Sequence, residues 1–187
     1  MSHADWDRLQ YYSRKVRVFT KIDTDYPQVH PSTYLRIAQL QSSALFPCLR
    51  QLYYNLDDSS IVSPIFLLLS PLLDSLKLLN IRGLENIIVG PILATLQVSS
   101  QMVSRISLHN GHMSVDIFKK IIVHFKQLRS LELSDAVFMS DFVLWEVLGT
   151  LPSLADFTLK VFNLESHPRT PLRIQVARVG VPSILKL

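Results

Sequence analysis

The stretch LRSLELSD at residues 128–135 decides the fold, because its leucine spacing recurs along the chain. LDSLKLLN at residues 73–80 repeats that spacing without change. Looser copies are LRQLYYN at 49–55, VSRISLHN at 103–110 and LADFTLKV at 154–161. The central apolar residues of the five segments are spaced 24 to 30 positions apart: Leu52, Leu76, Ile106, Leu131 and Phe157. A recurring period of this length predicts a solenoid of stacked units with one continuous core.

The composition is that of a folded chain of about one domain. Of its 187 residues, 48% are hydrophobic and 18% are charged, which excludes a wholly disordered chain. The single cysteine, Cys48, provides neither a disulfide framework nor a four-ligand zinc site, and we expect it to act as a small buried hydrophobic residue. We therefore expect an intracellular protein of a reducing compartment, cytoplasmic or nuclear.

Neither a nucleic acid nor a membrane is an expected partner. The net charge is only +4, and the basic residues do not form a tight stripe interleaved with aromatic residues. The first twelve residues lack the apolar region of a secretory signal. The most apolar stretch, residues 61–79, contains Pro64, Pro71, Asp74 and Lys77, so its uncharged part is too short to span a bilayer.

Strand and helix patterns alternate with short links. This alternation predicts an α/β fold in which neighbouring strands pair directly, giving a curved parallel sheet inside and helices outside. Residues 15–22, KVRVFTKI, predict a first strand in which Val16 and Val18 alternate with Arg17, so that Arg17 faces outward.

Helices are expected up to residue 12, from about residue 33 with Ser32 as N-cap, and over 86–96 with an interruption near Pro91. Three more are expected: one that starts at residues 57–59 and has residues 65–69 on its apolar side, and two after the N-caps Ser114 and Ser140. The expected domain organisation is an N-terminal helix–strand–helix cap or degenerate first repeat (1–45), irregular repeats (46–163) and an atypical C-terminal tail with a candidate last strand (164–187).

The repeated segments resemble leucine-rich-repeat proteins, whose skeleton is LxxLxL. Leu73, Leu76 and Leu78 follow it, and so do the three leucines of residues 128–135. The consensus asparagine or cysteine three residues beyond the last leucine is replaced, which puts a side-chain ladder along the turns in doubt. The residues at these positions are Ile81, Gly111, Ala136 and Phe162.

Residues 5–19, 66–96 and 124–159 are also similar to fungal (mushroom-type) F-box proteins. The similarity covers roughly residues 5–160. It implies that this chain is the repeat region of such a protein, which is expected to hold the substrate of a cullin ubiquitin ligase. The F-box itself, which docks the Skp-type adaptor, is not recognisable before residue 30, so adaptor binding is not expected through this chain alone.

No catalytic, cofactor or metal motif is recognisable. The five glycines form no phosphate-binding loop, and no nucleophile elbow occurs. His109 and His112, with Asp116 nearby, have a spacing that suits no known zinc motif, and they are interpreted as two exposed histidines around a turn. Cys48 has no visible activating partner. We expect no enzyme activity and no cofactor.

Alternate side chains of a strand point to opposite faces, so the neighbours of the five buried anchors predict a second, polar face. Its mixed charges and its tyrosine suit protein recognition, although solvated sheet positions would look the same. The candidate protein-binding residues are Arg17, Gln51, Tyr53, Ser75, Lys77, Arg105, Ser107, His109, Ser130, Glu132, Ser134, Asp156, Thr158 and Lys160.

The expected function is therefore a non-catalytic protein-interaction module of about five to six repeats. The resemblance implies substrate recognition for an F-box type ubiquitin ligase. Two alternatives stay open: an incomplete or non-functional repeat fragment, and a hydrolase or transferase with an unrecognised site.

Overall fold

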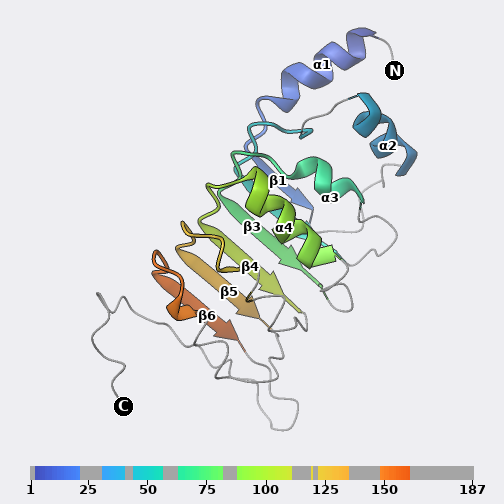
Figure 1. Ribbon diagram of the computed structural model, residues 1–187. Helices are drawn as coiled ribbons and strands as arrows, with labels where there is room; N and C mark the ends of the chain where they lie inside the picture. The colour runs from blue at the N-terminus through green and yellow to red at the C-terminus, as the bar shows by residue number, and fades with distance from the viewer. Residues whose placement is uncertain are drawn as a thin grey trace, which may run out of the picture.

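The computed structural model describes residues 3–21, 31–40, 44–56, 63–81, 88–110, 119, 122–134 and 148–160. They contain a six-stranded sheet in which every pair of neighbours is parallel and the spatial order follows the sequence (Figure 1). The strands are β1 (Val18–Lys21), β2 (Gln51–Asn55), β3 (Ser75–Leu79), β4 (Arg105–His109), β5 (Ser130–Ser134) and β6 (Asp156–Lys160). The predicted α/β class with directly paired parallel strands is confirmed.

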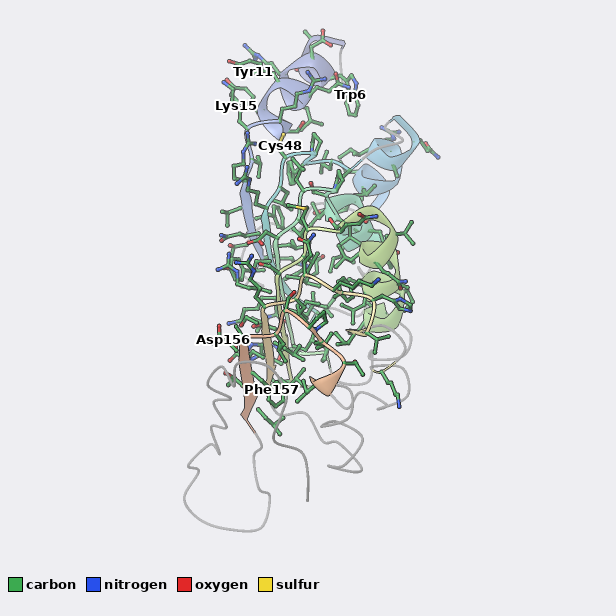
Figure 2. All side chains as sticks on the ribbon, turned by 60° about the vertical axis from the view of Figure 1, so that its left-hand side comes forward. Trp6, Tyr11, Lys15, Cys48, Asp156 and Phe157 are labelled. Carbon is green, nitrogen blue, oxygen red and sulfur yellow. The ribbon has the colours of Figure 1, made fainter. Side chains whose placement is uncertain are left out.

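The described helices are α1 (His3–Ser13), α2 (Pro31–Leu40), α3 (Ser63–Leu68) and α4 (Gly90–Ser99). Figures 1 and 2 show α2, α3 and α4 on one side of the sheet, with α1 beyond its β1 end. Parallel neighbours need crossover connections, and α3 and α4 lie in two of them. Most of the helices expected after Ser114 and Ser140, and the tail at 164–187, lie outside the described residues.

The core lies between the sheet and the helices. The five predicted anchors pair in one register, Leu52 with Leu76, then Ile106, Leu131 and Phe157, and none is more than 1% exposed. A second inward row follows two residues later in each strand and is also buried: Tyr54, Leu78, Leu108, Leu133 and Leu159. Ile65 of α3 and Ile92, Leu93 and Leu96 of α4 complete the same cluster. The anchor prediction is confirmed.

The predicted orientation of the first strand is wrong by one residue. Phe19 pairs with Leu52 and packs against the core, whereas Val18 faces away and is 51% exposed. Arg17 precedes β1, and its guanidinium donates to the Arg14 carbonyl at 2.6 Å. The larger Phe19 side chain covers more apolar area than Val18 would, which favours the observed register.

Two helix starts also differ from prediction. α2 begins at Pro31, so Ser32 lies inside the helix and is not its N-cap. The expected interruption at Pro91 is the start of α4, because Pro91 lies in its first turn. Proline is favoured at both positions, since its missing N–H would have no partner within the first turn of a helix.

A tight turn precedes each of the strands β2, β3, β5 and β6. The amides of Leu49, Leu73, Leu128 and Leu154 each donate to the carbonyl three residues earlier, at 3.0, 3.1, 3.0 and 3.3 Å. Proline occupies the second turn position at Pro47, Pro71 and Pro152, where its fixed φ suits the turn.

Buried serines connect successive turns. The hydroxyl of Ser70 donates to the Pro47 carbonyl at 2.8 Å, and that of Ser100 donates to the Ser70 carbonyl. Both serines are fully buried. Because a buried carbonyl without a partner is costly, these two bonds hold three successive units at a defined spacing.

The opposite ends of the strands carry an asparagine ladder. Asn110 donates its amide to Asn80 at 2.6 Å, and Asn80 donates to Asn55 at 3.0 Å. Asn80 and Asn110 have φ of 54° and 57°, in the left-handed region that asparagine tolerates better than most residues. A side-chain ladder therefore exists, one residue before the consensus positions held by Ile81 and Gly111.

Candidate binding face of the sheet

The sheet face opposite the helices, which we call the open face, carries three rows of residues that are aligned by the strand register. Figure 2 shows its side chains projecting away from the helices. The first row is Val18, Gln51, Ser75, Arg105, Ser130 and Asp156, the second is Thr20, Tyr53, Lys77, Ser107, Glu132 and Thr158, and the third is Asn55, Leu79, His109, Ser134 and Lys160. Thirteen of the fourteen candidate residues lie in these rows, and Arg17 lies before β1.

Exposure differs within the open face. Arg105 and Asp156 are exposed, whereas Tyr53, Lys77 and Thr158 are half-buried. Ser75 and Ser134 are buried, at 9% and 3% exposure. Ser75 lies between the longer Gln51 and Arg105 in its row, and Ser134 lies beside His109. These two candidate residues are therefore less accessible to a partner than the exposed residues of the open face, and they contribute to packing.

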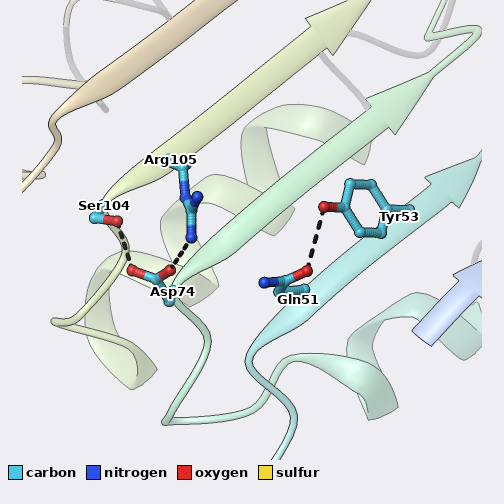
Figure 3. A network of polar contacts seen from close by, with 5 residues as sticks. All are labelled: Gln51, Tyr53, Asp74, Ser104 and Arg105. Atoms are coloured by element: carbon cyan, nitrogen blue, oxygen red, sulfur yellow. Dashed lines mark hydrogen bonds and ion pairs between the residues drawn. The ribbon is translucent and has the colours of Figure 1, made fainter. Parts of the chain in front are cut away.

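The start of β3 holds an ion pair that the sequence interpretation missed (Figure 3). Arg105 Nη2 donates to Asp74 Oδ2 at 2.7 Å, and the Ser104 hydroxyl donates to Asp74 Oδ1 at 2.5 Å. The backbone brings them together, since the amides of Ser104 and Arg105 both donate to the Asp74 carbonyl. Asp74 and Ser104 occupy the same position, two residues before an anchor, and this equivalence is the sequence signal that could have paired them.

The Asp74 carboxylate is held in its charged form. Burial alone would raise its pKa, but hydrogen bonds from Ser104 and Arg105 and the positive charges of Arg105 and Arg50 outweigh burial, so the pKa of Asp74 lies below its usual value. The side chains of Arg105 and Asp74 are 54% and 36% exposed, so solvent screens their attraction. The pair orients the guanidinium more than it stabilises the fold.

This pKa shift predicts a pH dependence of stability. Because the folded pKa lies below the unfolded one, the contribution of Asp74 is complete above about pH 4 and disappears as the pH falls through the folded pKa. Urea unfolding should show the native chain more stable than Asp74→Asn near neutral pH, with the difference shrinking in more acidic solution. Arg105→Ala should weaken this pH dependence. A difference that stays constant with pH would contradict the assigned shift.

The centre of the open face contains a hydroxyl, a carboxylate and an imidazole. Ser107 donates its hydroxyl to Glu132 Oε2 at 2.9 Å, and His109 Nε2 lies 3.8 Å from the same oxygen. His109 was interpreted as exposed, but its side chain is only 15% exposed because it lies between β3 and β5. The attraction between His109 and Glu132 is ionic only when the imidazole is protonated.

These three residues are not arranged for nucleophilic catalysis. Activation of a serine needs its hydroxyl to contact a base that can accept the proton, normally an imidazole. Here the Ser107 hydroxyl donates to a carboxylate, which is a weak base. The arrangement suits recognition of a partner by hydrogen bonds and charge better than it suits proton transfer.

The remaining candidate groups do not converge. Cys48 is a free, half-buried thiol, less buried than expected, and His112 and Asp116 lie outside the described residues. Within the ranges that the structure describes, no three His, Cys, Asp or Glu side chains are placed to hold a metal ion. Across the same ranges, every helix is too short or too polar to span a lipid bilayer.

Comparison with known proteins adds no family assignment. No protein-family model matches the chain, and no curated protein matches it. The similarity to leucine-rich-repeat and F-box proteins therefore remains a prediction that rests on the residues quoted above.

Proposed function

We propose that this chain is a leucine-rich-repeat solenoid that acts as a protein-interaction module and performs no chemistry itself. One observation carries the proposal: a single parallel sheet has one dry face against the helices and an opposite face of polar side chains of both charges, aligned across its strands. Stacked repeats characteristically use such an extended surface for binding.

The finer proposal is substrate recognition for an F-box type ubiquitin ligase. It rests on the resemblance over roughly residues 5–160. That role needs an extended protein-binding surface, and the open face offers anchors of the kinds common at interfaces. Tyr53 and Arg105 are of residue types enriched among binding hot spots, and Lys77 lies beside Tyr53 in the second row.

A hydrolase or transferase receives less support from the geometry. The described face brings Ser107 to Glu132 rather than to His109, so the chain of contacts from nucleophile to base is missing there.

The test is capture of partners on the immobilised chain, identification by mass spectrometry, and rebinding of each purified partner. Tyr53→Ala combined with Lys77→Ala should weaken a genuine partner about tenfold or more, because half-buried anchors near the middle of an interface dominate binding. The matched control is Val98→Ala, at an 83% exposed position on α4. Two outcomes would contradict the proposal. Either the Tyr53/Lys77 double variant and the Val98→Ala control weaken partner binding equally, or neither of them weakens it.

A further inference from the structure

The residues that lead into the strands form a continuous line along one edge of the sheet, which we call the N-terminal edge. The carbonyl of Arg17 accepts bonds from the amides of Arg50 and Gln51, at 2.8 and 3.0 Å. The same paired bonds recur from strand to strand, and the residues that they align are Arg17, Arg50, Asp74, Ser104, Arg129 and Ala155. One backbone pattern therefore places one side chain per strand along this edge.

Arginine dominates this line. Arg17, Arg50 and Arg129 are exposed, and Arg105 lies directly beside the line at the start of β4. Among the described residues at 14–18, 44–51, 69–75, 100–105, 122–130 and 148–156, the acidic side chains are Asp74 and Asp156 alone. The basic side chains of these segments are more numerous: Arg14, Lys15, Arg17, Arg50, Arg105, Lys126 and Arg129. The edge is thus positively charged.

The ion pair at Asp74 is an example of how side chains at this edge bind a carboxylate. Asp74 receives hydrogen bonds from Ser104 and Arg105 and also feels the charge of Arg50. Two arginines from neighbouring repeats therefore act on a single carboxylate between them. Arg50 and Arg129 expose the same planar guanidinium donors, which match carboxylate oxygens in geometry.

We propose that the N-terminal edge binds an acidic peptide segment, whose Asp or Glu carboxylates contact Arg17, Arg50, Arg105 and Arg129. The inference rests on the proposed protein-binding function and specifies the partner's chemistry. From Arg17 at β1 to Arg129 at β5 the edge crosses four strand spacings, or about 19 Å. An extended peptide covers that distance with about six residues. Exposed Tyr11 lies beside Lys15 near the β1 end (Figure 2). Exposed Tyr12 also lies against Lys15, so both aromatic side chains extend the surface.

Fluorescence polarisation with a labelled peptide of about six glutamates tests the proposal directly, using the full chain. The glutamate probe should bind at least about tenfold tighter than its glutamine counterpart, and added salt should weaken it. Arg50→Ala and Arg129→Ala should each weaken binding about three- to tenfold. The matched control is Arg36→Ala, at an exposed arginine of α2 in the helix layer, which should leave the affinity unchanged.

Asp74→Asn is expected to change the affinity for the glutamate probe in the opposite direction. It removes the carboxylate that occupies Arg105, so the glutamate probe should bind more tightly, by about two- to fivefold. Weaker binding of the glutamate probe to correctly folded Arg50→Ala and Arg129→Ala, together with this gain, would establish the site.

Equal affinity for the glutamate and glutamine probes, or an equal loss with Arg36→Ala, would overturn the proposal. Tighter binding of single-stranded oligothymidylate through the same arginines would also overturn it, in favour of a nucleic-acid site. If the acidic probe fails while captured partners still depend on Tyr53 and Lys77, the acidic specificity is wrong and the protein-binding function stands.

Discussion

Replacement of Leu131 by alanine is expected to lower the free energy of unfolding by about 2–5 kcal/mol. Leu131 is 0% exposed and lies between Ile106 and Phe157 in the anchor row. Its neighbours belong to strands fixed by the backbone ladder, so they cannot close fully around the missing atoms and a cavity remains. Urea unfolding followed by circular dichroism measures the loss.

Ser130→Ala is the matched control, because Ser130 is the adjacent residue on the open face of the same strand. We expect its effect to stay within about 0.5 kcal/mol, as at most surface positions. Similar losses for the two variants would mean that the two faces of β5 are assigned incorrectly.

Asn80→Ala is expected to lower the free energy of unfolding by about 2–4 kcal/mol, from two causes that add. The first is the loss of the amide side chain that links Asn55 to Asn110. The second is the backbone, since Asn80 has φ of 54° and alanine is less stable than asparagine in the left-handed region. Unfolding in urea provides the measurement.

Asn80→Gly separates these two causes. Glycine adopts positive φ without strain but cannot make the ladder bonds, so its loss should be about 1–2 kcal/mol. If glycine and alanine destabilise the chain equally, the backbone conformation of Asn80 contributes nothing, and the ladder accounts for the whole effect.

Much of the open face follows from residue spacing. Once Leu76 and Leu131 are assigned to the core, the alternation of strand side chains assigns Lys77 and Glu132 to the other face, and the observed pairing agrees. The first strand is an exception. Val16, Val18 and Phe19 support either of two registers, and packing against Leu52 selects the one that buries Phe19.

The contacts between particular side chains are harder to predict from the sequence than the face of the sheet on which a strand residue lies. Asp74 lies 31 residues from Arg105 and 30 from Ser104 in the chain, and only the parallel register brings these three residues together. The burial of His109 has a similar origin, because it depends on the neighbouring strands and not on the asparagine and glycine that follow it in the sequence. A local pattern carries no information about such distant neighbours.

The sequence by itself determined the parallel order of the strands, the five anchor residues and the face on which each residue of β2 to β6 lies. These properties follow from short-range periodicity, since an apolar residue at every second strand position must be buried to leave water. The tertiary structure alone decided the register of β1, the asparagine ladder, and the line of arginines at the N-terminal edge. Each of these depends on contacts between residues about 24–33 positions apart in the chain, which form only when the strands are stacked.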